Sequence, residues 1–392
     1  MLGVIFFAVM VDLIGFGIVL PLLPFYASSF GASPFVIALL ASVFSIAQFI
    51  TAPLLGGLTD RIGRRPVFLA CTLISCLAYI GLAHADNLLM VFLARIFAGI
   101  GAGKIGIAQA IIADSTPPEQ RARGMGMVGA AFGLGMILGP VLGGLLTGPN
   151  PAAPNYHLPA LAAALASFCA LGFALWRLKE THPPGRAQAG GMPSRNPLRG
   201  LDKIGPIALA LILVQFFINF VFAQIEVLFP LFTADRFGWH AFEVGIAFTF
   251  IGIIVLTMQG GLIGPLSRRF GESLLLRIGI VGLAFGTLIV AWVVNVPMLG
   301  LSILFTATSF AMINPSLASL ISRAAAPEHQ GITLGAAQGL AALGRVLGPL
   351  LGGLLYEAVS PEAPYLVGGV LLLLTLLVFY KPMRRVGRGA EP

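Results

Sequence analysis

The chain has 392 residues, of which 58% are hydrophobic and only 10% are charged. Soluble proteins carry about 25% charged residues, so this composition excludes an ordinary soluble enzyme. The net charge of +8 would suit a nucleic acid, but the basic residues are spread over short loops between apolar runs. Apolar runs of roughly 18 residues or more, the length that crosses a bilayer, recur along the whole chain. The sequence therefore predicts an all-α polytopic membrane protein.

These apolar runs divide into twelve predicted membrane-spanning helices. The first run has no charged region ahead of it and no small-residue cleavage site, so we interpret it as a retained helix. The predicted spans are residues 4–26, 34–56, 66–84, 88–113, 123–147, 158–178, 204–231, 242–266, 273–294, 298–322, 331–356 and 364–381.

A glycine-rich stretch occurs twice, with its prolines 209 residues apart. Between residues 118–146 and 327–355, 13 of 29 positions are identical, which packing alone does not explain. Glycines three or four residues apart let another helix approach closely, and an intramembrane proline bends the helix. Two copies in one register indicate a duplicated bundle. The copies are Gly126-x8-Gly135-x3-Gly139-Pro140-x2-Gly143-Gly144 and Gly335-x8-Gly344-x3-Gly348-Pro349-x2-Gly352-Gly353.

Other segments repeat as well. Leu20-Pro21-Leu22 resembles Phe229-Pro230-Leu231, and Phe30-Gly31 matches Phe237-Gly238. Both halves begin on the same side, so we expect parallel repeats that place a substrate site at their interface near the membrane midplane. The segment between them is rich in Pro, Gly and basic residues and is predicted to be a linker. The predicted domains are two pseudo-symmetric six-helix bundles at 1–178 and 204–381, the linker 179–203 and a tail 382–392.

The distribution of basic residues predicts the orientation. Nineteen of the 23 Lys and Arg residues lie on one side of the predicted topology, and the opposite loops hold only Arg236. The positive-inside rule then places both termini and the linker in the cytoplasm.

The short loop after the second span combines glycines with charges. Glycine permits a tight turn with positive φ, and the charges would lie at the level of the lipid headgroups. A topology signal explains the arginines, but it does not need Asp60. In the counterpart loop Arg268 stands where Asp60 would fall, so a function of this carboxylate belongs to the first half only. The first loop reads Gly56-Gly57-Leu58-Thr59-Asp60-Arg61-Ile62-Gly63-Arg64-Arg65, and the second Gly264-Pro265-Leu266-Ser267-Arg268-Arg269-Phe270-Gly271-Glu272.

These motifs resemble signatures of the major facilitator superfamily. The first loop resembles the superfamily's loop signature, and the stretch 126–144 looks like the fifth-helix signature of its proton-driven exporters. Two further patterns are similar to those of the twelve-helix drug:proton antiporters, the group that contains the tetracycline exporters. They are Asp12-x2-Gly15-x-Gly17-x3-Pro21 and Arg95-x3-Gly99-x-Gly101.

The resemblance covers nearly the whole chain and implies the major facilitator fold and an exporting antiporter. It implies that Asp60 meets the N-terminal end of a second-half helix near Gly331, and that Arg65 pairs with Asp114. Known tetracycline exporters have an acidic residue in the third helix, which the span 66–84 lacks, and their fourth helix does not usually bear a lysine such as Lys104. The antiporter class is therefore implied, whereas tetracycline as the substrate is not.

Five charged residues lie well inside predicted spans: Asp12, Arg95, Lys104, Glu226 and Arg345. Each costs about 2.5–3.5 kcal/mol at a helix centre, so such residues usually face the bundle interior and have a function. At about 1.5 Å per residue, Asp12 falls between Arg95 and Lys104, and either side chain reaches it. Glu226 and Arg345 are at depths that allow them to pair. A purely structural ion pair is the alternative for each.

Proton coupling needs one carboxylate that binds either a proton or the substrate. A nearby cation changes the proton affinity of a buried carboxylate, so a cation that moves can switch it. We expect Asp12 to be the proton carrier, because the residue 209 positions later is Val221 and the site is asymmetric. Glycines 15 and 17 are expected to let its helix bend, and Glu226 is the second candidate carrier. Polar residues that could line the substrate cavity are Gln48, Gln109, Gln215, Asn219, Gln224, Asn314 and Gln338.

We therefore expect a proton-coupled antiporter of a bacterial inner membrane that exports small amphipathic compounds. It needs no cofactor beyond the proton gradient and has no enzymatic site, no phosphate-binding loop and no metal or nucleic-acid partner; we expect a monomer in contact with lipid. The cysteines Cys71, Cys76 and Cys169 lie in apolar runs and are expected to be packing residues.

Three alternatives remain. A lipid or glycolipid flippase would use Lys104 and Arg345 to bind an anionic headgroup. A proton-coupled importer is disfavoured by the fifth-helix signature, and a sensor that moves nothing would not need glycine signatures in both halves. With two acids against three bases in the spans, an acidic or zwitterionic substrate is at least as well supported as a cation.

Overall fold

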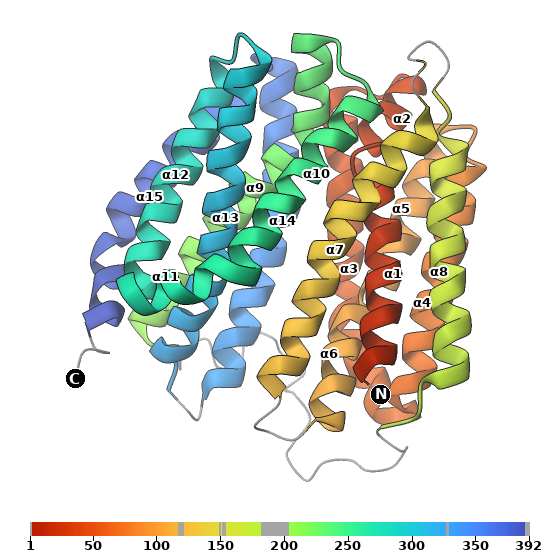
Figure 1. The fold of residues 1–392 in the computed structure, drawn as a ribbon, viewed down its shortest axis with the longest axis horizontal. Coiled ribbons are helices and arrows are strands. Elements are labelled where there is room, and N and C mark those ends of the chain that lie inside the picture. The colour runs from red at the N-terminus through yellow and green to blue at the C-terminus, as the bar shows by residue number, and fades with distance from the viewer. Residues whose placement is uncertain are drawn as a thin grey trace. The chain divides into compact units, whose positions relative to one another are not determined.

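The computed structural model describes residues 2–116, 121–148, 150, 154–181, 204–326 and 329–388, and these contain helices and no strand. The predicted linker residues 182–203 and tail residues 389–392 lie outside this set. The elements are α1 (Leu2–Val19), α2 (Leu23–Ser29), α3 (Pro34–Ile62), α4 (Arg64–Ala83), α5 (Leu88–Ala102), α6 (Lys104–Ser115), α7 (Arg121–Thr147), α8 (His157–Arg177), α9 (Pro206–Phe237), α10 (Ala241–Thr257), a π-helix (Met258–Leu262), α11 (Ile263–Phe270), α12 (Glu272–Ala291), α13 (Val296–Ala324), α14 (Gln330–Ala358) and α15 (Ala363–Arg388) (Figure 1).

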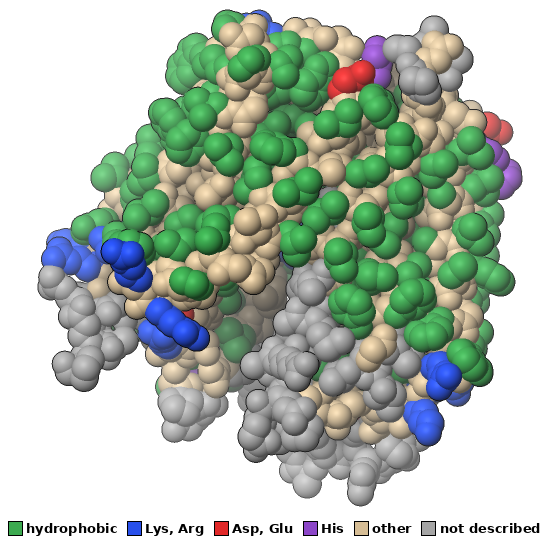
Figure 2. All heavy atoms as spheres, in the orientation of Figure 1, with side chains coloured by type: hydrophobic (Ala, Val, Ile, Leu, Met, Phe, Trp, Pro, Cys, Tyr) green, Lys and Arg blue, Asp and Glu red, His purple; other side chains and the backbone are tan. Residues whose placement is uncertain are grey.

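These helices agree with the predicted all-α membrane fold. Among the described residues, ten helices are long and apolar enough to cross a membrane, and the bent pair α1–α2 makes an eleventh span. The 27-residue α7 takes the place of the remaining predicted span. Hydrophobic side chains cover the middle of the face seen in Figure 2, while Lys and Arg side chains gather toward its lower margin. This surface is that of a multi-span membrane protein.

Three predicted spans are interrupted. The first is not one helix, because the chain turns at residues 20–22, around Pro21, and α1 and α2 meet at 43°. The fourth is divided into α5 and α6 at Gly103. The eighth contains the π-helix Met258–Leu262, a distortion that is frequent at functional sites. The last predicted span is longer than expected, since α15 continues past Pro382 to Arg388.

The chain forms two compact units. The first comprises Met1–Ala189 and Phe229–Gly252, and the second comprises Gly190–Leu228 and Ile253–Pro392. The division into six-helix halves joined by a linker stays a prediction.

In the first unit α1 lies between α7 and α8 (Figure 1). Gly135, Gly139 and Gly143 of the α7 signature face α1: a methyl group at Gly139 would lie 2.6 Å from the backbone of Gly17, and one at Gly143 would lie 2.6 Å from Ile18 O. On its other side α1 places Gly15 against Ala163 of α8. The expectation that Gly15 and Gly17 loosen α1 is therefore wrong, because they serve close packing and the bend comes later, at Pro21.

The second unit repeats this seam. A methyl group at Gly344 would lie 2.7 Å from Phe216 O, and Gly348 and Gly352 also lie against α9 with no room for one. Each signature helix therefore packs its glycine face against the first long helix of its half. Gly335 is different, since no atom lies within 4 Å of the methyl position there.

The cysteines only partly follow the prediction. Cys71 and Cys76 are buried in α4, but Cys169 is exposed on α8. The apolar run that contains Cys169 has an outward face as well as a packed one, since Leu165 and Phe168 are also exposed.

Candidate functional site

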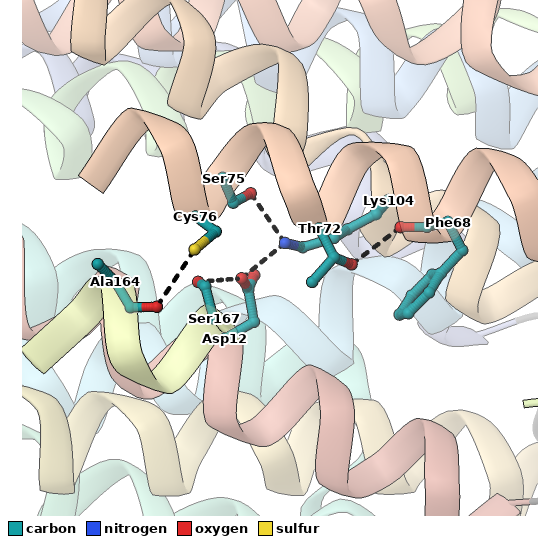
Figure 3. A network of polar contacts seen from close by, with 8 residues as sticks. All are labelled: Asp12, Phe68, Thr72, Ser75, Cys76, Lys104, Ala164 and Ser167. Carbon is teal, nitrogen blue, oxygen red and sulfur yellow. Dashed lines mark hydrogen bonds and ion pairs between the residues drawn. The ribbon is translucent and has the colours of Figure 1, made fainter. Parts of the chain in front are cut away.

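Asp12 and Lys104 form a direct ion pair inside the first unit (Figure 3). Lys104 Nζ donates to Asp12 Oδ1 at 2.6 Å and to Ser75 Oγ at 2.8 Å. Ser167 Oγ donates to the same Asp12 oxygen at 3.2 Å. Four helices, α1, α4, α6 and α8, thus contribute to one network. Asp12 is only 8% exposed and Lys104 only 3% exposed, so the pair is removed from solvent.

The break between α5 and α6 places Lys104 at this site. Gly103 ends α5, and Lys104 is the first residue of α6. Gly101, one turn earlier, lies against α4 so closely that a methyl group would overlap Ser75 Oγ. Gly101 of the Arg95-x3-Gly99-x-Gly101 pattern therefore brings α5 near α4, which carries the serine that also binds the lysine, whereas Gly99 lies against Phe44 and Ala47 of α3.

The pair settles which cation neutralises Asp12. Depth alone allowed either Arg95 or Lys104, and the structure selects Lys104. Removal of one partner from a buried pair typically costs about 3–5 kcal/mol, because the other charge is left without compensation. Neutralising Asp12 would therefore leave Lys104 as a buried charge without its partner.

Arg95 lies elsewhere in the same unit. Its guanidinium carbon is 4.3 Å from the centre of the Phe44 ring, and this ring packs against Phe16 with centroids 5.6 Å apart. Arg95 is 3% exposed, and its Nε has no hydrogen-bond partner. No carboxylate among the described residues forms a salt bridge with it. The Phe44 ring stabilises this buried guanidinium, but it offsets only part of the cost of burying the charge.

The second unit has a looser charge pair. Arg345 Nη1 donates to Asn219 Oδ1 at 3.2 Å, and Asn219 Nδ2 donates to Gln215 O at 2.9 Å. The predicted pairing of Glu226 with Arg345 is not a direct one, since the described side chains show no salt bridge between them. Arg345 is therefore held by an amide, and the acid stands apart from it.

An aromatic pair accompanies these charges. Phe222 of α9 and Phe310 of α13 stack with ring centroids 3.5 Å apart and an interplanar angle of 6°. Asn219, Phe222 and Glu226 follow one another at helical spacing and so share one face of α9. Neither phenylalanine is among the predicted site residues, although the helical spacing from Asn219 to Glu226 is a signal for Phe222.

The predicted cavity residues differ in their surroundings. Gln224 is 1% exposed, and its Nε2 donates to Pro364 O, so it bonds α9 to α15 within a packed core. A role in lining an open cavity is wrong for this residue. Gln48, Gln215, Asn219 and Asn314 are half-buried, whereas Gln109 and Gln338 are exposed.

The charged loop after the second span reduces to one residue, Gly63, between the ends of α3 and α4. Asp60 and Arg61 are exposed in the last turn of α3. Arg64 Nε lies 3.0 Å from Asp114 Oδ2, whereas Arg65 Nη2 donates to Leu175 O at 2.9 Å. The predicted pairing of Arg65 with Asp114 is therefore wrong: successive helical residues point about 100° apart, and the first arginine faces α6.

The second unit carries the same kind of ion pair with its charges exchanged. Glu272 begins α12, and its Oε2 lies 3.3 Å from Arg323 Nη2 near the end of α13. Ser319 Oγ also donates to this oxygen at 2.8 Å. Where the first unit has a cation at the start of the third span, the second has an anion. An ion pair thus joins the start of α4 to the end of α6 and the start of α12 to the end of α13, with the positions of acid and base exchanged.

The chain is similar to known transport proteins over almost its entire length. It is 32% identical to the tetracycline resistance protein, class C, of Escherichia coli, over 95% of this chain and 94% of that protein. It is 29% identical to the human major facilitator superfamily domain-containing protein 10, over 96% of this chain and 92% of that one.

The chain is also similar to solved structures of transport proteins. The crystal structure of the human organic anion transporter MFSD10 (TETRAN) matches with a TM-score of 0.73 at 28% identity, covering 96% of this chain and 98% of that one. A POT family transporter bound to a thioalcohol-conjugated peptide matches with a TM-score of 0.82 at 14% identity, covering 98% and 96% of the two chains, which shows the shared fold alone.

The family model described as Major Facilitator Superfamily matches residues 5–345 and, in a second match, residues 260–392. Together with the helical membrane fold and the relatives above, this match assigns the family. The chain belongs to the major facilitator superfamily.

Proposed function

We propose that this transporter is a proton-coupled antiporter that exports small amphipathic compounds across a bacterial inner membrane. The observation that carries the proposal is the buried pair of Asp12 and Lys104, sealed by Ser75 and Ser167. Charged residues within spans are rare and usually mark substrate or proton pathways. The similarity to a tetracycline resistance protein of Escherichia coli supports both the export direction and the bacterial membrane.

Asp12 offers two exclusive states. Ionised, it accepts bonds from Lys104 and Ser167, as in the structure. Protonated, it loses the charge that holds Lys104, which then keeps only Ser75 among the side chains it now contacts. A cationic substrate group that takes the place of Lys104 beside Asp12 favours the ionised carboxylate again, so the proton leaves as the substrate binds. One carboxylate then serves proton and substrate in turn, which is what exchange requires.

The second unit supplies a surface suited to amphipathic compounds. The stacked Phe222 and Phe310 offer flat apolar contact, while Glu226 and Arg345 offer one charge of each sign nearby. Arg345 donates to Asn219, and no salt bridge joins it to Glu226 among the described residues, so this acid remains able to pair with a substrate group. We assign substrate contact to this face and the proton to Asp12.

The loop between α3 and α4 is assigned to gating. Asp60 is exposed, and among the described residues it forms no ion pair. A carboxylate at this position suits the positive N-terminal end of a helix, and the start of α14 near Gly331 is the proposed partner. The positive-inside rule places this loop, both termini and the linker in the cytoplasm.

Export of organic acids is the second candidate. Arg95 is buried without a carboxylate partner in the described part of the chain, whereas Lys104 is already neutralised. The human relative of known structure is an organic anion transporter. An anionic substrate would compensate the charge of Arg95, and an aromatic body would suit the Phe16–Phe44 pair beside it.

Reconstitution tests both candidates. Purified protein in liposomes is given tetracycline, a cationic dye, or an aromatic carboxylic acid alongside its neutral methyl ester, with and without an imposed proton gradient. We expect gradient-driven accumulation that a protonophore abolishes. Accumulation of the acid but not the ester would select the second candidate. Movement that ignores the proton gradient, or no movement of any of these compounds by folded protein, would contradict the proposal.

A further inference from the structure

The start of α4 carries positive charge where a helix disfavours it. Arg64 and Arg65 are its first two residues, and the N-terminal end of a helix carries roughly half a positive charge of its own. Asp114 compensates the side chain of Arg64. The backbone N–H groups of this first turn need acceptors too, because a helix leaves its first four without partners.

Glu180, just beyond the end of α8, is that acceptor. Its Oε1 accepts a hydrogen bond from Arg64 N at 2.9 Å, and its Oε2 accepts one from Arg65 N at 3.1 Å. Oε1 also accepts a hydrogen bond from the backbone of the next residue, Thr181 N, at 3.0 Å, which helps to orient the carboxylate. Arg65 Nη2 donates to Leu175 O in the last turn of α8. The end of α8 and the residues after it therefore hold the start of α4 at three points.

Gly63 makes room for this carboxylate. A methyl group at Gly63 would lie 2.5 Å from Glu180 Oε2. The counterpart Gly271 also separates two helices and also has positive φ, 76° against 95° for Gly63, but no atom lies within 4 Å of its methyl position. The second unit needs no remote acceptor of this kind, because Glu272 itself begins α12 and suits the helix end.

We propose that Glu180 is a positioning residue of the transport cycle that fixes the cytoplasmic gating loop. The proposal rests on the proposed function, since it assigns a device to the same gate. Gly63 alone joins α3 to α4, so the hold of Glu180 on the first turn of α4 sets the direction of the last turn of α3. That turn carries Asp60. Glu180 is also the second residue of the predicted linker 179–203, so its hydrogen bonds connect the gating loop with the start of that linker.

Glu180→Gln tests the hold directly, because it keeps the shape and removes the charge. Hydrogen–deuterium exchange of wild-type protein and variant is compared for the peptides that cover residues 56–70. Loss of these charge-assisted bonds should speed exchange of the Arg64 and Arg65 amides by roughly tenfold or more. Unchanged exchange there would overturn the proposal. This readout does not depend on what the protein transports.

Transport gives the second readout. A gate that is mispositioned slows turnover without altering the substrate site, so kcat should fall roughly tenfold while KM and substrate affinity stay within about twofold. Equal loss of kcat and affinity would show a merely structural role and contradict the proposal. Glu243→Gln is the matched control: Glu243 Oε2 also accepts a backbone N–H at a helix start, that of His240, but at α10. It should leave turnover unchanged.

A glycine pair separates the carboxylate from backbone strain. Gly63→Ala and Gly271→Ala both place a side chain at positive φ, which is unfavourable for either. Only Gly63→Ala also displaces Glu180. It should therefore raise loop exchange and lower turnover as Glu180→Gln does, and the double variant should be no worse than Gly63→Ala. Equal effects of the two glycine variants would overturn the role of Glu180.

Discussion

In the first unit the buried acid and base are bonded directly, with Lys104 Nζ 2.6 Å from Asp12 Oδ1, whereas among the described residues of the second unit no salt bridge joins Glu226 to Arg345. The first pair is enclosed by serines, and the second stands beside the stacked Phe222 and Phe310. Two halves with the same helix seams thus hold their charges in different ways. We call Asp12 and Lys104 the closed pair, and Glu226 and Arg345 the open pair. A buried, directly bonded pair suits a proton switch, whereas an acid and a base without a salt bridge between them suit contact with varied substrates.

The largest expected effect comes from breaking the closed pair at the acid. Asp12→Asn keeps the shape but cannot be ionised, so the side chain can no longer alternate between two charge states. We expect proton-driven accumulation to disappear, while substrate still binds and moves down its own gradient. Liposome uptake with and without a proton gradient measures both. A variant that concentrates substrate as well as the wild type would contradict the assignment of Asp12.

Breaking the same pair at the base should cost stability as well. Lys104→Ala leaves Asp12 buried without its cation, and we expect a loss of about 3–5 kcal/mol in unfolding free energy. The double variant Asp12→Asn with Lys104→Gln removes both charges and should regain most of the stability without regaining proton coupling. Thermal unfolding in detergent, measured alongside uptake, checks this. A double variant that is no more stable than Lys104→Ala would show that the charges are not coupled.

The seams that both units share should respond alike. A methyl group has no room at Gly139 in the first unit or at Gly348 in the second, whereas the space at Gly335 is open. We expect Gly139→Ala and Gly348→Ala each to destabilise by about 1–3 kcal/mol, as overpacked cores do. Gly335→Ala should stay near wild type. Melting temperatures of the three variants test this, and equal melting temperatures would refute the packing account.

The open pair should give the smallest change. Glu226→Gln removes a carboxylate that has no direct salt bridge, so stability should change by less than about 1 kcal/mol. Substrate affinity should fall for cationic compounds and hold for acidic ones, with proton-driven uptake retained. Binding titrations with one compound of each charge test this. Loss of proton coupling in Glu226→Gln would reverse the roles given to the two units.

The sequence allowed much of the fold to be predicted, and it narrowed the partner of Asp12 to two cations, Arg95 and Lys104. Apolar run length located the spans, and helical depth placed Lys104 and Asp12 at levels where they meet. It did not show that Arg64, and not Arg65, faces Asp114, because one residue of rotation about a helix axis decides it. Glu180 was missed for a different reason. Its partners are backbone amides 115 and 116 residues earlier, and such contacts leave no periodic signal.

Proton release on substrate binding tests the central claim most directly. Purified protein in weakly buffered detergent is mixed with a saturating transported compound, and a pH-sensitive dye follows the bulk solution. If Asp12 gives up its proton as substrate binds, the wild type and Glu226→Gln should both release protons, and Asp12→Asn should release none while still binding. Proton release that persists in Asp12→Asn and vanishes in Glu226→Gln would contradict the account.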